Sequence, residues 1–227
     1  MSLPGSLPAV VELRRYLLHP GRRDTLIGLF EGSLAAPQEA CGMRLLGRFA
    51  DLDAPERFVW LRGFADMQAR RRALQAFYGG PVWRRHRDAA NATMIDSDDV
   101  LLLRPVLAPD PAAGARPADG AAAGVLGVIC HFDAPFDAAL PERFRAQAWP
   151  YWRNRGAVLL GGFASEHARN TFPALPVREG EHVFAWFARV PAWPEGAAAA
   201  VWHADAGGPA PRGCETMRLR PTAASPW

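Results

Sequence analysis

Five residues near the N-terminus are of types that could together bind and transform a small acid. Glu12, Arg14 and Tyr16 alternate along one apolar stretch, and Trp60 and Arg62 alternate along another. Alternation along a strand places such residues on one face of a sheet. An arginine matches a carboxylate with two parallel hydrogen bonds, and a tyrosine hydroxyl can act as an acid or base. The pattern predicts a ligand-binding wall of Glu12, Arg14, Trp60 and Arg62, with Tyr16 as a catalytic candidate.

A structural interpretation competes with this one. Glu12 and Arg14 could simply pair on a sheet while Tyr16 caps the end of a barrel. His86 is a second acid–base candidate, although its neighbours Arg84, Arg85 and Arg87 favour an exposed helix face.

Motifs for cofactors and metals are not found. His131 and Asp133 could share a strand face, but no third ligand follows at the usual spacing, so we expect no metal site. We find no glycine-rich phosphate loop, catalytic triad motif or nucleophile elbow, and we expect no cofactor.

The elements that must position these residues follow from periodicity. The first half predicts a strand, a helix, two strands, two helical pieces and a strand, at 10–17, 22–36, 43–50, 57–64, 66–78, 82–93 and 99–106. We expect Pro37 to kink or end the first helix. The second half predicts strands and helices at 125–132, 138–155, 157–164, 182–190, 195–202 and 215–220. This order is the α+β, ferredoxin-like β-α-β-β-α-β plan, present twice.

Short sequence matches support the duplication. They pair 45–50 with 159–164, 103–105 with 219–221, and 58–60 with 184–186. The last pair has the larger offset, which predicts an insertion around 169–181. Three prolines, two glycines and no large apolar residue mark 108–123 as a linker between halves at 9–107 and 124–221.

Each half would leave one sheet face bare, so the two bare faces should pack together. In one form of this arrangement they enclose a cavity in an α/β barrel. Because helices need an apolar face, we expect the polar residues to point into that cavity. The equivalent positions of the second half are Val128, Cys130 and Phe132, so one end of the cavity would be charged and the other apolar.

The first half resembles a known family through its motifs. These are Glu12–Tyr16, Pro20-Gly21, Leu46–Phe49, Pro81–Trp83 and Leu101–Pro105, and they are similar to those of NIPSNAP proteins. The second half lacks the Glu-Leu-Arg-x-Tyr run. The resemblance implies a dimeric α/β-barrel fold, shared with small monooxygenases, haem-degrading enzymes and muconolactone-isomerase-like proteins. The activity of the family is poorly defined, and its animal members are tied to mitochondria and protein interactions, so the resemblance supports fold more than function.

Composition limits the source, the compartment and the partners that we expect for the protein. The 227 residues carry a net charge of +3, and every basic residue is arginine, which suggests a GC-rich bacterial genome. No apolar run approaches the roughly 18 residues of a membrane span, and no secretory signal is visible. Three widely spaced cysteines suggest reduced thiols in a cytoplasm. We expect no nucleic-acid or membrane partner, and a homo-oligomer is possible.

Three functions remain open at this point. The first is binding of a small organic acid or aromatic molecule inside the barrel, with cofactor-free oxygenase or isomerase chemistry. The second is a protein-interaction module with a filled barrel core and an exposed surface near Trp83–Arg87. The third is haem degradation, for which His86 is the first-half candidate.

Overall fold

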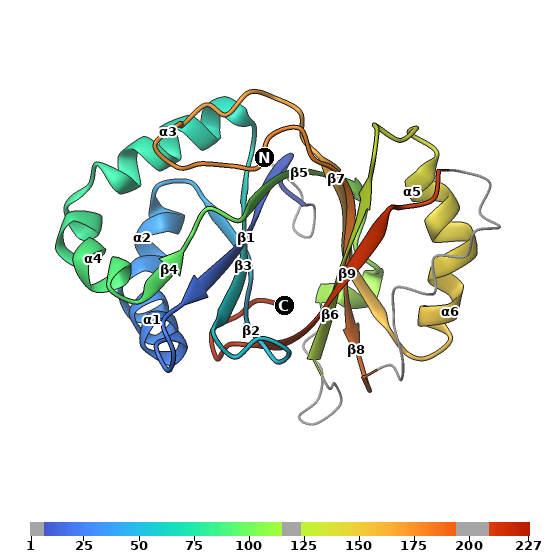
Figure 1. The fold of residues 1–227 in the computed structure, drawn as a ribbon, viewed down its shortest axis with the longest axis horizontal. Coiled ribbons are helices and arrows are strands. Elements are labelled where there is room, and N and C mark those ends of the chain that lie inside the picture. The colour runs from blue at the N-terminus through green and yellow to red at the C-terminus, as the bar shows by residue number, and fades with distance from the viewer. Residues whose placement is uncertain (1–6, 115–123, 194–208) are drawn as a thin grey trace.

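The computed structural model describes residues 7–114, 124–193 and 209–227. Eight long strands form one closed antiparallel barrel in the order β3-β2-β9-β6-β8-β7-β5-β1, and β1 pairs with β3 to complete the ring (Figure 1). The strands are β1 (Val10–Leu18), β2 (Arg44–Asp51), β3 (Arg57–Phe64), β5 (Val100–Leu107), β6 (Gly124–Phe132), β7 (Val158–Ser165), β8 (His182–Val190) and β9 (Gly213–Pro221). The short β4 (Met94–Asp96) pairs with the end of β1.

The barrel consists of two four-stranded groups, one from each half of the chain. The first group has the order β5-β1-β3-β2, and the second has the order β9-β6-β8-β7. They join through the pairs β2–β9 and β5–β7. In each group, therefore, the last strand in the sequence pairs with the second strand of the other group.

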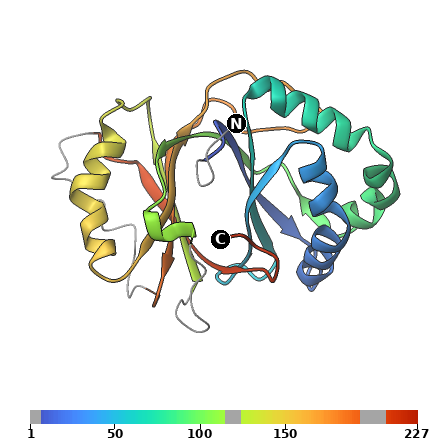
Figure 2. The same ribbon diagram turned by 180° about the vertical axis from the view of Figure 1, so that it is seen from behind.

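Helices cover only the outside of each group (Figures 1 and 2). The first half contributes α1 (Arg23–Leu29), a π-helical turn (Phe30–Leu34), α2 (Ala35–Ala40), α3 (Met67–Tyr78) and α4 (Pro81–Asn91). The second half contributes α5 (Leu140–Arg143), a π-helical turn (Phe144–Ala148) and α6 (Trp149–Arg153). The short helix predicted at 195–202 lies outside the described residues.

The interior of the barrel, between the two four-stranded groups, holds an apolar core. Its buried side chains come from all eight strands and include Val11, Leu13, Phe49, Val59, Leu61, Leu103, Ile129, Phe163, Val183, Phe187, Met217 and Leu219. Trp227 lies against Phe49 and Phe187, with ring centroids 6.5 and 5.8 Å away. A Cβ added at Gly127 would lie 2.9 Å from the Phe187 ring. The expected polar wall inside the barrel is therefore wrong, because apolar side chains occupy that position.

The two halves share local irregularities at the same sequence offset. The π-helical turn that begins at Phe30 has its counterpart at Phe144, which is 114 residues later. The register shift between Leu45 and Gly47 recurs between Leu159 and Gly161, again 114 residues later. A proline follows each π-helical turn, and the first helix continues to Ala40 past Pro37 instead of ending there.

The start of the predicted linker packs against the barrel. Pro111–Gly114 forms a 3-10 turn, and Ala113 contacts the barrel core. Asp110 holds this turn in place, because its backbone N–H donates to the Leu159 carbonyl at 2.9 Å and its carboxylate accepts from the Leu159 N–H at 3.0 Å. Small residues can thus fill a barrel mouth although they cannot form a core of their own.

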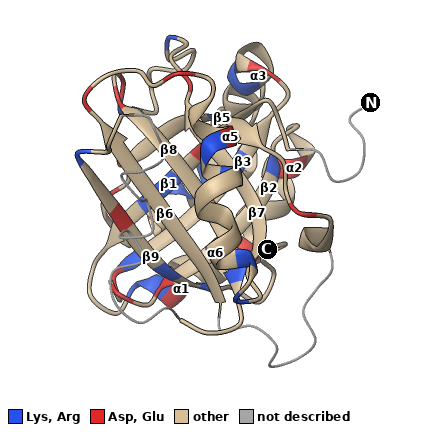
Figure 3. Ribbon diagram, turned by 90° about the vertical axis from the view of Figure 1, so that its right-hand side faces the viewer, with Lys and Arg blue, Asp and Glu red and all other residues tan. Residues whose placement is uncertain are grey.

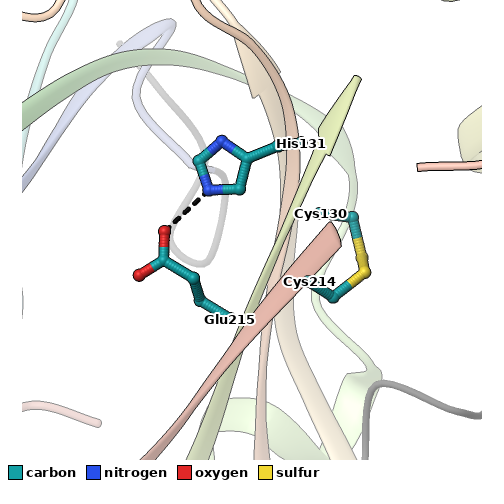
Figure 4. The surroundings of a disulfide bond; sticks show 4 residues. All are labelled: Cys130, His131, Cys214 and Glu215. Atoms are coloured by element: carbon teal, nitrogen blue, oxygen red, sulfur yellow. Dashed lines mark hydrogen bonds and ion pairs between the residues drawn. A yellow bond between two sulfur atoms is a disulfide. The ribbon is translucent and has the colours of Figure 1, made fainter. Parts of the chain in front are cut away.

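A disulfide joins Cys130 of β6 to Cys214 of β9, on the outer face of the second sheet (Figure 4). The expectation of reduced thiols is wrong for this pair, because the register places the two cysteines directly opposite each other on neighbouring strands. Cys41 is a free thiol. None of the helices in the described ranges is long and apolar enough to span a membrane.

Candidate anion-binding site

The five residues of the predicted wall lie together, but beneath the helices of the first half. The β1–β3 register places Glu12 opposite Arg62, Arg14 opposite Trp60 and Tyr16 opposite Phe58. All of these side chains share the outer face of the sheet. There they join the core under α1, α3 and the π-helical turn, with Phe30, Leu74 and Phe77 among the buried side chains.

The predicted direction of this wall was wrong for a physical reason. Val11, Leu13, Val59 and Leu61 belong to the core between the sheets, and a filled barrel needs apolar residues there from every strand. The helices can pack against polar side chains of the sheet because they contribute polar side chains that bind them. Arg70 on α3 is one of these groups, and its side chain is fully buried.

Glu12 is the centre of the cluster and accepts hydrogen bonds from three arginines. Its Oε2 lies 2.7 Å from Arg62 Nε and 2.9 Å from Arg14 Nη1, and its Oε1 lies 2.7 Å from Arg70 Nε. All four side chains are at most 1% exposed. One carboxylate therefore balances three guanidinium groups away from water.

Neutral side chains surround these charges. Arg14 Nε donates to the Tyr16 hydroxyl at 2.9 Å. Arg62 Nη1 donates to Gln38 Oε1 at 3.0 Å and to the Tyr78 hydroxyl at 3.4 Å. The Trp60 ring lies within 5.6 Å of the Arg14 guanidinium and 5.0 Å of the Arg62 guanidinium. Cation–π contact of this kind is favourable, but it neutralises no charge.

Three donors of the cluster are unsatisfied. Trp60 Nε1, Arg62 Nη2 and Arg70 Nη2 are buried and have no hydrogen-bond partner within residues 7–114, 124–193 and 209–227. A buried donor without a partner costs about 1–3 kcal/mol, and more when it is charged. Such groups are rare in folded proteins, and each one calls for an explanation. An excess of buried cations together with unsatisfied donors is typical of a site for an anion.

The cluster keeps Glu12 ionised and Tyr16 protonated. Burial raises the pKa of Glu12, but the charges of Arg62, Arg14 and Arg70 outweigh it and hold the pKa well below its usual range. Burial also raises the pKa of Tyr16, so its phenol keeps its proton. Burial lowers the pKa of the Arg70 guanidinium, and the Glu12 carboxylate only partly offsets this effect. Arg70 is thus the cation that would gain most from a further negative partner.

Comparisons with known proteins agree with this fold. The model of the NIPSNAP family matches residues 11–109. Residues 11–109 make up most of the N-terminal half, which is called the NIPSNAP half for this similarity. A NIPSNAP-like domain protein from Burkholderia xenovorans is 25% identical over 41% of this chain and 81% of its own, with a TM-score of 0.38. No significant match was found among curated proteins.

Two structures resemble this chain over most of its length. A provisionally assigned monooxygenase from Lactobacillus acidophilus NCFM is 13% identical, covers 93% of each chain and has a TM-score of 0.52. Another from Fusobacterium nucleatum subsp. nucleatum ATCC 25586 is 8% identical, covers 93% of this chain and 91% of its own, and has a TM-score of 0.54. At such low identity the similarity shows the fold alone, and it extends from the NIPSNAP half through the second half.

Three members of the cluster were missed in the sequence: Gln38, Arg70 and Tyr78. Arg70 is followed by Arg71 and Arg72, and a run of three arginines by itself favours an exposed helix face. Its spacing of four and seven residues from Leu74 and Phe77 would have placed it on the buried stripe of the NIPSNAP half. His86 lies on α4, and no hydrogen bond or ion pair among the described residues joins it to the cluster.

Among its described residues, the second half has no charged counterpart of the buried cluster around Glu12. The strand registers correct the expected equivalents: Glu12, Arg14 and Tyr16 correspond to Leu126, Val128 and Cys130, 114 residues later, which pack in an apolar core with Trp186. Figure 3 shows β6 without charged positions and β8 with few. His131 Nε2 lies 2.7 Å from Glu215 Oε1, and within the described ranges no group of three or more His, Cys, Asp or Glu could hold a metal ion.

Proposed function

We propose that the N-terminal half binds a small organic acid between its sheet and its helices. The observation that carries this proposal is the charge imbalance of the buried cluster, in which three guanidinium groups share one carboxylate. The unsatisfied nitrogens of Arg62 and Arg70 would donate to the carboxylate of the ligand. The aromatic rings of Tyr16, Phe30 and Trp60 favour a ligand with an aromatic or cyclic body.

Any chemistry at this site would use Tyr16 as the proton donor. Its hydroxyl accepts from Arg14 Nε, which leaves its own proton available to a ligand. We therefore extend the proposal to cofactor-free isomerase or oxygenase chemistry, with Arg14 fixing the direction of the phenol. His86 has no part in it, because it lies apart from the cluster on α4.

Binding can be tested with benzoate and its neutral analogue benzamide. Benzoate should raise the melting temperature of the wild-type protein, and benzamide should not, because only the carboxylate meets the excess charge. Arg70→Met should weaken benzoate binding about tenfold or more, which corresponds to about 1.4 kcal/mol. Arg71→Met is the matched control, since Arg71 is exposed on the same helix. Equal loss in both variants, or none in Arg70→Met, would count against the site.

A second candidate function is supported by a different observation. The barrel core is filled, and Arg84, Arg85 and Arg87 are exposed on α4, as expected for a protein-interaction module. An acidic protein partner would then be captured by the wild type and lost when the three arginines are replaced by glutamine. The Arg70→Met variant would capture that partner as well as the wild type does.

We also propose how the two halves of the chain are related. We interpret the two halves as tandem ferredoxin-like repeats at 9–107 and 124–221, supported by the shared offset of their π-helical turns and strand irregularities. Cytoplasmic location stays a prediction. Disulfides persist mainly in oxidising compartments, so the state of Cys130 and Cys214 in the cell is the observation that tests it.

A further inference from the structure

The second half contributes a cover to the site of the first half. The connection between β7 and β8 spans residues 166–181, whereas the equivalent connection between β2 and β3 spans only 52–56. Figures 1 and 2 show this longer segment, in orange, reaching over the end of the barrel towards α3. We refer to residues 166–181 as the strap.

The middle of the strap contacts the anion site directly. Asn170 Oδ1 accepts a hydrogen bond from Arg70 Nη1 at 2.9 Å. The Phe172 ring stacks on the Tyr78 ring with centroids 6.1 Å apart, and Tyr78 in turn accepts from Arg62. Thr171 Oγ1 donates to the Met67 carbonyl at the start of α3. The strap therefore closes the side of the cluster on which Arg70 lies.

The strap is the cover that can move at least cost. None of its residues is fully buried, and it contains no helix or strand. In contrast, α3 buries Leu74 and Phe77 in the core of the first half. Local opening has a low free energy where few apolar contacts are lost. Because the cluster is closed to solvent, a ligand needs such an opening to reach it.

Ion pairs hold the root of the strap at the barrel end. Arg178 Nη1 lies 3.1 Å from Asp99 Oδ1, and its Nη2 lies 2.6 Å from Glu181 Oε1. Asp99 also pairs with Arg15 of β1 at 2.9 Å, and Arg15 pairs with Glu215 of β9 at 2.6 Å. Arg178 thus ties the strap to Asp99, which lies next to β5, and through Asp99 and Arg15 to Glu215 of β9.

We propose that the strap is a removable cover of the anion site and that Arg178 is its latch. This inference rests on the proposed function, because it assigns the second half the task of controlling access to the acid site. It also accounts for a second half whose described residues place no charged side chain beneath its own helices, yet which carries the longer connection.

Hydrogen–deuterium exchange tests the latch without a ligand. In Arg178→Met, the amides of residues 166–181 should exchange about tenfold faster than in the wild type, while those of β8 keep their rates. Arg169→Met is the matched control, because Arg169 is exposed on the same segment. Unchanged strap exchange in Arg178→Met would overturn the latch, and so would faster exchange throughout the barrel.

Stopped-flow binding of benzoate, followed by tryptophan fluorescence, tests the cover. Arg178→Met should raise the association and dissociation rates about fivefold each and change the dissociation constant much less. If benzoate binds both proteins at equal rates, the proposal that the strap covers the site is wrong, and the proposal of an acid-binding site is unaffected. If benzoate binds neither protein, the acid site and its cover both fall, and the exchange rates still decide whether Arg178 holds the strap.

Discussion

Glu12 Oε2 lies 2.7 Å from Arg62 Nε across the β1–β3 pair, and both side chains are fully buried. Removing one partner of a buried ion pair leaves the other uncompensated, at a cost of about 3–5 kcal/mol. We expect Glu12→Gln to lower the free energy of unfolding by about this amount, since three arginines would lose the carboxylate that they share.

The control for this change is Arg70→Met. It removes one excess cation and leaves Glu12 with Arg14 and Arg62, so it should cost far less than Glu12→Gln. Urea denaturation of both variants measures the difference. Equal costs would show that the cluster carries no excess positive charge.

Acid should reveal the lowered pKa of Glu12. Because this pKa is lower in the folded state than its ordinary value of about 4.3, the folded protein binds fewer protons between the two values. The stability contributed by Glu12 is therefore complete above about pH 5 and is lost as the pH falls. The gap in unfolding free energy between wild type and Glu12→Gln should narrow between pH 5 and pH 3. A constant gap would contradict the assignment.

The filled barrel predicts that Gly127 tolerates no side chain. An added Cβ would lie 2.9 Å from Phe187 and 3.0 Å from Met217, so Gly127→Ala should destabilise the protein by about 1–3 kcal/mol through overpacking. Gly213→Ala is the control, because a Cβ there meets nothing within 4 Å. A hollow barrel would accept both substitutions equally well, and thermal denaturation would then show two similar melting temperatures.

The disulfide predicts a defined pattern of thiol chemistry. Alkylation before reduction should modify Cys41 alone, and a peptide pair linking Cys130 to Cys214 should appear on non-reducing digestion. Replacing both linked cysteines with serine should cost about 2–4 kcal/mol. Full alkylation of all three cysteines in the unreduced, unfolded protein would show that the disulfide is absent.

Alternation in the sequence predicts which of these residues lie together, but not the side of the sheet on which they lie. Alternation groups Glu12, Arg14 and Tyr16, and the observed register brings Trp60 and Arg62 to them as expected. Alternation alone cannot say which face the helices cover, because that depends on the side chains that the helices contribute to the interface. Arg70 could have decided the question, since it shares the buried stripe of α3 with Leu74.

Other features depend on contacts between distant segments. The duplicated motifs indicated two halves, but the pairing of β2 with β9 and of β5 with β7 is a property of the closed barrel. The insertion around 169–181 could be seen in the changed offset between the halves. Its position over the first half could not, because Asn170 meets Arg70 across 100 residues of sequence.

The location of the ligand tests the central claim most directly. A crystal structure with 4-bromobenzoate should place the anomalous bromine signal between the sheet and α3 of the N-terminal half, with the carboxylate against Arg62 and Arg70. A bromine signal between the two sheets, among Leu13, Phe49 and Phe187, or a crystal saturated with the acid and free of any signal near Glu12, would contradict the account.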